Sequence, residues 1–213
     1  MRNLAIFGGT DLGQLFAAVA RADGGYRVAG FIDDFQEPGT PTAGGPVLGR
    51  VDDIQRLQRE GTVDALLIGV GYKHPAFRRA CFERFATLID IPTLVHPAAH
   101  LEPTSSLGRG TVVGAGCVVD GGVSVAENCY FNPGCVIAHD TSVGANCFFG
   151  PGVTLAGFIT IGEDCFLGVG TTVIDNLTIA AGTQTGGGTL VCSDITEPAL
   201  YVGNPARRLR DRR

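Results

Sequence analysis

The stretch FNPGCVIAHDTSVGANCF (131–148) repeats a pattern of six residues three times. Cut before each bulky apolar residue, it reads FNPGCV, IAHDTS and VGANCF. The same register extends in both directions from Leu107 to Leu190 as 14 consecutive hexads without an insertion. Thirteen of the 14 first positions are bulky and apolar, and only Thr185 departs from the pattern. An α-helix cannot produce this period, because its apolar residues recur every three to four residues.

Hexad repeats are typical of a parallel β-helix, in which each hexad forms one flat side of a coil. Three hexads make one triangular coil, so residues whose numbers differ by 18 lie in one column. The fifth position of the hexads is mostly small or β-branched. It holds five cysteines, which we interpret as small apolar side chains that fill a narrow interior: Cys117, Cys129, Cys135, Cys147 and Cys165.

The column rule gives His139 a defined environment. Its column reads Gly121, His139, Gly157, Asp175, so the imidazole has a glycine on the coil to either side. Glycines there leave a groove in which a thin ligand can approach the ring and exposed backbone N–H groups. The other three histidines lie outside the hexads, so His139 is the only group of the repeat that changes charge near neutral pH.

Spacing alone leaves two interpretations of His139 open, an acyl-transfer site and a polar corner residue that faces water. A single histidine argues against a β-helical enzyme with a zinc ion held by three imidazoles. We therefore expect no metal.

The residues before the hexads alternate short apolar runs with helical stretches. The pattern predicts strands over 4–8, 26–34, 64–71 and 91–96, and helices over 11–23, 51–60 and 75–88. Such alternation indicates a parallel sheet covered on both faces, a small Rossmann-like α/β domain. We predict this domain over 1–96, a linker and entry to the β-helix over 97–106, and a β-helix domain with a C-terminal tail over 107–213.

Composition narrows the classes of partner and location. The net charge is −5, and the only basic run is ARRLRDRR (206–213), so nucleic acid is not an expected partner. A helix needs about 20 consecutive apolar residues to cross a bilayer. No apolar stretch of the chain comes near that length, so we expect a cytoplasmic protein without a membrane span. Seven cysteines without CxxC spacing suggest neither a zinc site nor a disulfide framework.

Several motifs carry a resemblance to a known family. They are IFGGTDLG (6–13), FIDDF (31–35), IAHDTS (137–142), the glycines 186–188 and YVGNPARRL (201–209), together with the hexads. The chain resembles the left-handed β-helix acyltransferases, and within them bacterial sugar acetyltransferases that have an N-terminal Rossmann-like domain. That subgroup contains nucleotide-linked amino-sugar N-acetyltransferases of the bacillosamine and perosamine pathways, and sialic acid O-acetyltransferases of surface glycan synthesis.

The resemblance implies a homotrimer, with acetyl-CoA as co-substrate in the groove between adjacent prisms. It also implies a nucleotide sugar held by the N-terminal domain, with its sugar reaching toward the histidine. His139 matches the catalytic base and is followed by the acidic Asp140. Asn132 matches a position near the acceptor sugar. Further matches concern acetyl-CoA, with Gly157 and Gly187 near the pantetheine arm and the closing segment GNPARR (203–208) near CoA: Asn204, Pro205, Arg207 and Arg208.

Candidate nucleotide-sugar residues lie at the ends of three predicted strands. Gly9 and Gly13 belong to the first strand-to-helix turn, which departs from the family pattern because it lacks a Gly-His pair. The second strand ends in acidic residues that can accept hydrogen bonds from ribose hydroxyls or a base edge. The remaining candidates line the same predicted pocket: Asp33, Asp34, Phe35, Gly71, Tyr72 and Lys73.

Three functions remain open on these grounds. The first choice is an N-acetyltransferase acting on a nucleotide-linked amino sugar in surface glycan biosynthesis, with His139 as general base. The second is an O-acetyltransferase acting on sialic acid or a related sugar. The third is a non-catalytic β-helix scaffold, against which the single histidine in its glycine column argues.

Overall fold

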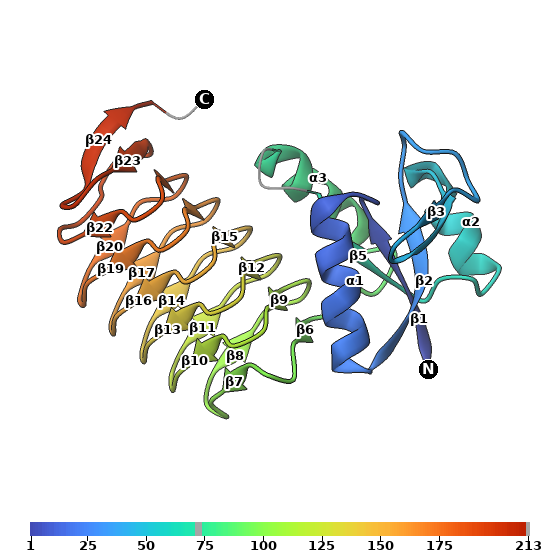
Figure 1. Ribbon diagram of the computed structural model, residues 1–213, viewed down its shortest axis with the longest axis horizontal. Coiled ribbons are helices and arrows are strands. Elements are labelled where there is room, and N and C mark those ends of the chain that lie inside the picture. The colour runs from blue at the N-terminus through green and yellow to red at the C-terminus, as the bar shows by residue number, and fades with distance from the viewer. Residues whose placement is uncertain (71–73, 212–213) are drawn as a thin grey trace. The chain divides into compact units, whose positions relative to one another are not determined.

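The structure is a computed structural model that describes residues 1–70 and 74–211. The chain divides into two compact units, Met1–Val95 and His96–Arg213, and each is described by itself. Figure 1 labels the elements along the chain.

The first unit is built on a five-stranded sheet with the order β3-β4-β2-β1-β5. The strands β1, β2, β4 and β5 are parallel, and only β3 runs antiparallel to its neighbour. The strands are β1 (Arg2–Phe7), β2 (Tyr26–Ile32), β3 (Pro41–Thr42), β4 (Gly45–Gly49) and β5 (Ala65–Ile68). The helices are α1 (Asp11–Asp23), a 3-10 turn η1 (Val51–Asp53), α2 (Ile54–Arg59) and α3 (Pro75–Phe85).

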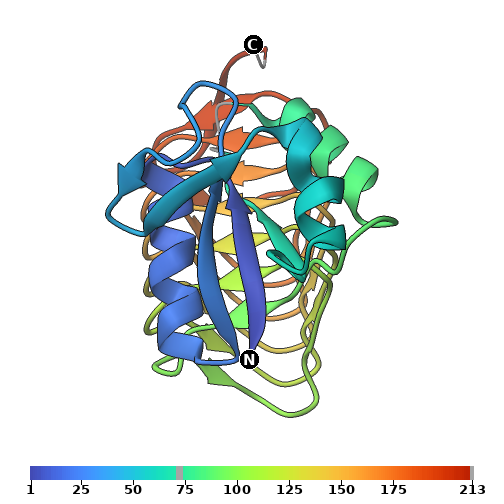
Figure 2. The same ribbon diagram turned by 90° about the vertical axis from the view of Figure 1, so that its right-hand side faces the viewer.

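Burial on both faces of the central strands explains their continuous apolar runs. Residues 4–6 of β1 and 65–67 of β5 are completely buried. In Figures 1 and 2, α1 and α2 lie on opposite sides of this sheet. The α/β class of the unit is therefore confirmed.

The sheet differs from the sequence prediction at two places. The pattern missed β3 and β4, because the segment 41–49 contains two prolines and three glycines and lacks an apolar run. The predicted strand 91–96 shortens to β6 (Leu94–Val95), which is not a member of the five-stranded sheet. Ile91 and Leu94 are nevertheless buried, so the apolar pattern there reports burial rather than membership of the sheet.

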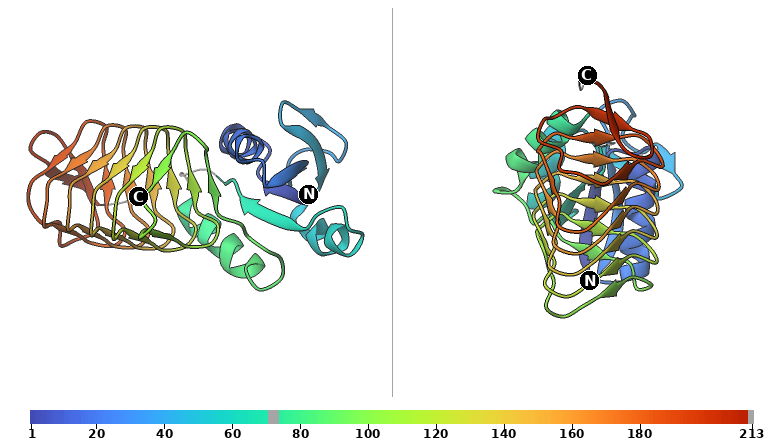
Figure 3. Two further views of the ribbon diagram at one scale, coloured as in Figure 1. Left: turned by 90° about the horizontal axis from the view of Figure 1, so that it is seen from below. Right: turned by 90° about the vertical axis from the view of Figure 1, so that its left-hand side faces the viewer.

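The second unit is a parallel β-helix whose strands, two residues long except for β23 and the antiparallel β24, form three faces, and Figure 3 shows its successive coils. One face contains β7 (His100–Leu101), β10 (Val118–Val119), β13 (Val136–Ile137), β16 (Thr154–Leu155), β19 (Thr172–Val173) and β22 (Leu190–Val191). The next contains β8 (Ser106–Leu107), β11 (Ser124–Val125), β14 (Ser142–Val143), β17 (Thr160–Ile161) and β20 (Thr178–Ile179). The last contains β9 (Val112–Val113), β12 (Tyr130–Phe131), β15 (Phe148–Phe149), β18 (Phe166–Leu167), β21 (Gln184–Thr185), β23 (Leu200–Val202) and β24 (Arg207–Arg210).

The predicted register of three hexads per coil is confirmed. Val118 pairs with Val136, Val136 with Thr154, and Thr154 with Thr172, and the other two faces keep the same spacing. The first residue of every hexad after Leu107 is buried, as expected for side chains that point into the interior.

The corners of the coils have one shared backbone conformation. The fourth residue of all 14 hexads has a positive φ, between 56° and 75°. This left-handed conformation costs an ordinary L residue about 1–2 kcal/mol, and glycine, asparagine and aspartate tolerate it best. Thirteen of the corners hold one of those three residues, and Phe158 holds the other. Eight of the corners are glycines, a quarter of the 32 glycines in the chain.

The fifth position of the hexads has a role beyond filling space. The Sγ of Cys147 lies 3.2 Å from the carbonyl oxygen of Gly162, on the next coil. Thr141 occupies the same position, and its Oγ1 donates over 3.1 Å to the carbonyl oxygen of Ala156. The interior cysteines are thus buried hydrogen-bond donors to the next coil as well as small apolar residues.

Candidate active site

His139 lies at a corner of the β-helix, directly after β13, and its side chain is half exposed. Its Nδ1 is 3.0 Å from Oδ2 of Asp140. Asp140 is the left-handed corner residue, with φ 56°, and aspartate is among the few residues that tolerate this conformation. The corner therefore gives the imidazole a carboxylate partner on one of its two nitrogens.

Gly157 lies on the next coil, against the imidazole. A Cβ added at Gly157 would lie 2.7 Å from Cε1 and 2.8 Å from Nε2 of His139. A Cβ at Gly121, on the opposite side of the column, would instead meet Oγ1 of Thr104 at 3.3 Å. Of the two glycines that flank the histidine in its column, Gly157 is the one whose missing side chain makes room for the ring.

The remaining β-helix candidates are spread over other corners. Asn132 is buried, and its Nδ2 donates to the carbonyl oxygen of Phe149 over 2.8 Å. Gly187 faces Val169, whose Cγ1 would lie 2.9 Å from an added Cβ, and Val169 is exposed. Within residues 1–70 and 74–211, no hydrogen bond or ring contact joins either residue to His139. Their roles toward acceptor sugar and acetyl-CoA stay predictions.

The C-terminal candidates form an exposed hairpin. Asn204 and Pro205 lie in the turn between β23 and β24, and Arg207 and Arg208 lie on β24. Arg208 forms an ion pair with Asp211, while Nη1 of Arg207 donates to the carbonyl oxygen of Ala206 over 3.0 Å. The hairpin presents cationic groups that are suited to phosphates, and its role near CoA stays a prediction.

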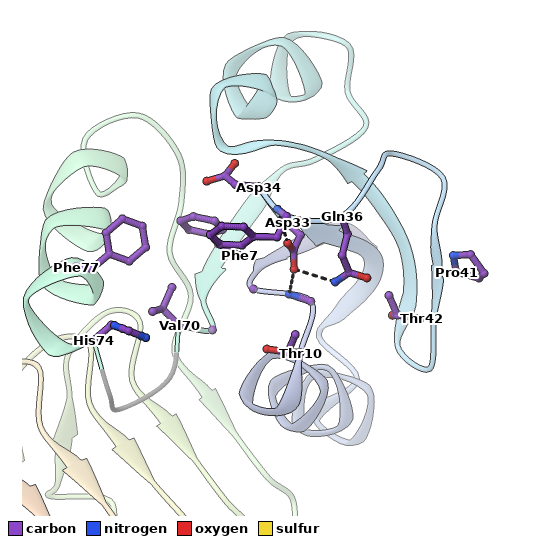
Figure 4. A pocket seen from close by; sticks show the side chains of 14 residues that line it. Phe7, Thr10, Asp33, Asp34, Gln36, Pro41, Thr42, Val70, His74 and Phe77 are labelled. Atoms are coloured by element: carbon purple, nitrogen blue, oxygen red, sulfur yellow. Dashed lines mark hydrogen bonds between the residues drawn. The ribbon is translucent and has the colours of Figure 1, made fainter.

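A second feature is a pocket of about 640 Å³ in the N-terminal unit (Figure 4). It opens at the carboxyl ends of β1, β2 and β5, the edge where open α/β sheets bind ligands. Of the predicted residues, it brings together Gly9, Asp33, Asp34 and Phe35. Gly13 does not line it, and the predicted Gly71, Tyr72 and Lys73 lie outside the described residues.

Asp33 is the central polar group of this pocket, and it is buried. Its Oδ2 accepts from the backbone N–H of Gly9 at 2.9 Å and from Nε2 of Gln36 at 3.0 Å, as Figure 4 shows. Its Oδ1 accepts from the N–H of Phe35 at 2.9 Å. Burial raises the pKa of Asp33, but these hydrogen bonds outweigh burial and hold the pKa below its usual value. The carboxylate therefore joins the ends of β1 and β2.

Gly13 has a packing role at the same turn. A Cβ there would lie 1.8 Å from the carbonyl oxygen of Gly8, so only glycine allows α1 to begin this close to β1. Asp34 is likewise engaged, because its Oδ1 accepts from the N–H of Val51 over 2.8 Å. Phe35 is different, since 99% of its surface is exposed at the pocket.

Sequence reasoning missed several pocket residues. Phe7 and Phe77 pack edge to face, with ring centroids 6.1 Å apart, and form an apolar wall. Phe7 could have been predicted as a pocket residue, because it is an aromatic residue at the carboxyl end of a strand. Phe77 could not, because its place in the helical pattern is that of a core residue. The other missed lining residues come mostly from irregular segments that no periodic pattern marks: Thr10, Gln36, Pro41, Thr42, Val70 and His74.

Within residues 1–70 and 74–211, no three His, Cys, Asp or Glu side chains come together as a group that could hold a metal ion. The search for a membrane-crossing helix, over the same residues, finds none that is long and apolar enough.

Comparisons with known proteins place this arrangement in a family. The PglD N-terminal domain profile matches residues 3–85, and the bacterial transferase hexapeptide profile matches residues 122–157. No curated protein matches the chain.

Solved structures match nearly its whole length. PerB from Caulobacter crescentus, in complex with CoA and GDP-perosamine, is 30% identical with a TM-score of 0.90, over 97% of each chain. The acetyltransferase domain of PglB from Neisseria gonorrhoeae is also 30% identical with a TM-score of 0.90, over 98% of this chain and 100% of that one. WeeI from Acinetobacter baumannii, at 21% identity and a TM-score of 0.84, shares the fold over 97% of this chain and 99% of its own. The chain therefore belongs to the family of bacterial sugar acetyltransferases that join a Rossmann-like N-terminal domain to a left-handed β-helix, and it is an acyltransferase.

Proposed function

We propose that the protein transfers the acetyl group of acetyl-CoA to the amino group of a nucleotide-linked amino sugar, with His139 as general base. The observation that carries the proposal is the half-exposed imidazole, which has the Asp140 carboxylate at Nδ1 and the bare backbone of Gly157 beside Nε2. The PerB structure, which contains CoA and GDP-perosamine, supports this choice of substrates.

The hydrogen bond at Nδ1 sets the chemistry of the other nitrogen. When Nδ1–H donates to Asp140, Nε2 carries the free lone pair and can accept a proton. The acceptor amine attacks the thioester carbonyl carbon, a C–N bond forms, and the amine proton passes to Nε2 of His139. Collapse of the tetrahedral intermediate breaks the C–S bond, and the imidazolium returns the proton to the CoA thiolate. The products are the N-acetyl sugar and CoA.

The thioester oxygen becomes negative in the intermediate and needs hydrogen-bond donors. We assign this task to backbone N–H groups at glycine positions beside His139, such as Gly157. Preorganised donors of this kind typically contribute 10²–10³-fold in turnover, by about 2.7–4 kcal/mol.

The N-terminal pocket is our site for the nucleotide. Its position at the carboxyl ends of parallel strands supports this role, and so does its size, which lies in the range of small-molecule sites. Because Asp33 already accepts three hydrogen bonds from the protein, we assign it to shaping the pocket. The exposed ring of Phe35 provides a flat apolar surface for a base or ribose.

Assembly and location complete the proposal. We propose a homotrimer in which Arg207 and Arg208 meet phosphates of CoA, and a cytoplasmic reaction that supplies surface glycan synthesis. Light scattering of the purified protein tests the trimer. If these arginines contact phosphates, the Arg207→Ala and Arg208→Ala variants should bind CoA more weakly than wild type. The difference in affinity should shrink as the salt concentration rises.

The main experiment measures CoA release and product mass with acetyl-CoA and UDP-, GDP- and dTDP-linked sugars. Each amino sugar is paired with the hydroxy sugar of the same structure, which separates N-transfer from O-transfer. We expect an amide product, and a turnover about 10²–10⁴-fold lower in His139→Ala with acetyl-CoA binding retained. An ester product, or near-normal turnover in His139→Ala, would contradict the proposal.

A further inference from the structure

One corner of the β-helix breaks the rule that the other corners follow. Phe158 has φ 58°, in the left-handed region where a bulky side chain is a rare outlier. The equivalent residues of all other hexads are glycine, asparagine or aspartate. Burial does not explain the exception, because 55% of the Phe158 surface is exposed. A conformation this unfavourable persists at functional sites where something else requires the side chain.

The ring of Phe158 contacts the imidazole of His139. The ring centroids are 5.0 Å apart and the planes meet at 88°, a T-shaped pair. This geometry is among those that aromatic pairs favour. The backbone N–H of Phe158 also donates to the carbonyl oxygen of His139 over 3.1 Å, so the two residues are joined through both backbone and side chain.

His139 is otherwise weakly confined for a group that must transfer a proton. Asp140 meets only Nδ1, and Gly157 has no side chain that could stop the ring from turning. The described residues supply one further ring contact to the imidazole, and it comes from Phe158.

We propose that Phe158 is a positioning residue that fixes the His139 imidazole for proton transfer, an inference that rests on the proposed function. It accounts for a strained and half-exposed phenylalanine at a corner that suits asparagine. A general base must lie within hydrogen-bond reach of the proton that it removes. A displacement of about 1 Å can cost on the order of 10²-fold in rate.

Three substitutions separate the ring from the strain. Phe158→Asn removes both, since asparagine is the corner residue at Asn128, Asn146 and Asn176. Phe158→Leu removes the aromatic ring and keeps the strain. Phe158→Tyr keeps both. The three variants are compared with the wild type for kcat, for KM of both substrates and for Tm.

We expect kcat to fall about 10–10²-fold in Phe158→Asn and Phe158→Leu with both KM values nearly unchanged, because only the proton-transfer step is affected. Phe158→Tyr should keep nearly normal kcat. The Tm should rise in Phe158→Asn and stay close to wild type in Phe158→Leu. Wild-type kcat in Phe158→Asn, or a change in KM alone, would overturn the proposal while the wild type remains an acetyltransferase.

A second measurement tests the inference without turnover. The ring protons of His139, observed by NMR, should carry a ring-current shift in the wild type and in Phe158→Tyr, and lose it in Phe158→Leu. A wild type that acetylates no sugar contradicts the proposed function. His139 resonances that are the same in all variants contradict the positioning role whether or not turnover is found.

Discussion

The β-helix and the N-terminal unit differ in how well the spatial neighbours of a residue can be deduced from its position in the sequence. In the β-helix, adding 18 to a residue number gives its neighbour on the next coil, so Gly157 could be placed beside His139 from the sequence. In the N-terminal unit, the strand pattern placed Gly9 and Asp33 at one edge of the sheet, but the hydrogen bond that joins these residues, 24 apart in the chain, is encoded by no local period. Long-range contacts can therefore be predicted from the sequence in a translational repeat, but not residue by residue in an α/β domain.

The largest effect is expected when a glycine in the column of His139 is replaced by alanine. Gly157→Ala should lower kcat on the order of 10²-fold, because the new Cβ would lie 2.7 Å from Cε1 of His139 and displace the ring. Gly121→Ala is the matched control in the same column, since its Cβ would meet Thr104 at 3.3 Å and leave His139 in place. Steady-state kinetics of the two variants should differ widely while both fold. Equal kcat values would show that the imidazole does not need the space left by the missing side chain of Gly157.

The interior offers a second test of the repeat. Cys147→Ala should lower the free energy of unfolding by about 1–3 kcal/mol, because it empties a fully buried side-chain position and leaves the partly buried carbonyl of Gly162 without this donor. Cys147→Thr should lose less, because threonine at the same hexad position already donates to the next coil at Thr141. Urea unfolding at a fixed protein concentration measures both. A larger loss in the threonine variant would mean that shape rather than hydrogen bonding decides this position.

The contrast between the β-helix and the N-terminal unit also explains which features could be predicted from the sequence. The hexads predicted the β-helix, its register and the isolation of His139, because each depends on a strict period. The period of 18 also puts Phe158 in one column with Asp140, but the contact of its ring with His139 depends on side-chain conformation, which the period does not encode. In the N-terminal unit, β3, β4 and the lining residues Gln36 and Thr42 were missed, since short irregular segments are ordered by tertiary contacts rather than by pattern.

The N-terminal pocket can be tested at the residue that contributes least to the fold. Phe35→Ala should raise KM for the nucleotide sugar about 10-fold, through loss of a stacking surface, and leave Tm unchanged because the ring is fully exposed. The KM for acetyl-CoA serves as the internal control and should not change. A fall in kcat without a change in KM for the sugar nucleotide would remove Phe35 from the binding site.

The smallest effect that we expect is the pH-dependent part of the contribution of Asp33 to the free energy of unfolding. Its pKa is lowered in the folded state, so the charged form stabilises the fold above the ordinary carboxyl pKa of about 4. This stabilisation is lost as the pH falls through the folded-state pKa. In Asp33→Asn the group no longer titrates, so the variant should be less stable than wild type at pH 7 and should lose less stability on acidification to pH 3. Urea unfolding at the two pH values measures the difference. If the two proteins lose equal stability, the hydrogen bonds from Gly9 and Phe35 do not depend on the charge, and the two strand ends are joined by geometry alone.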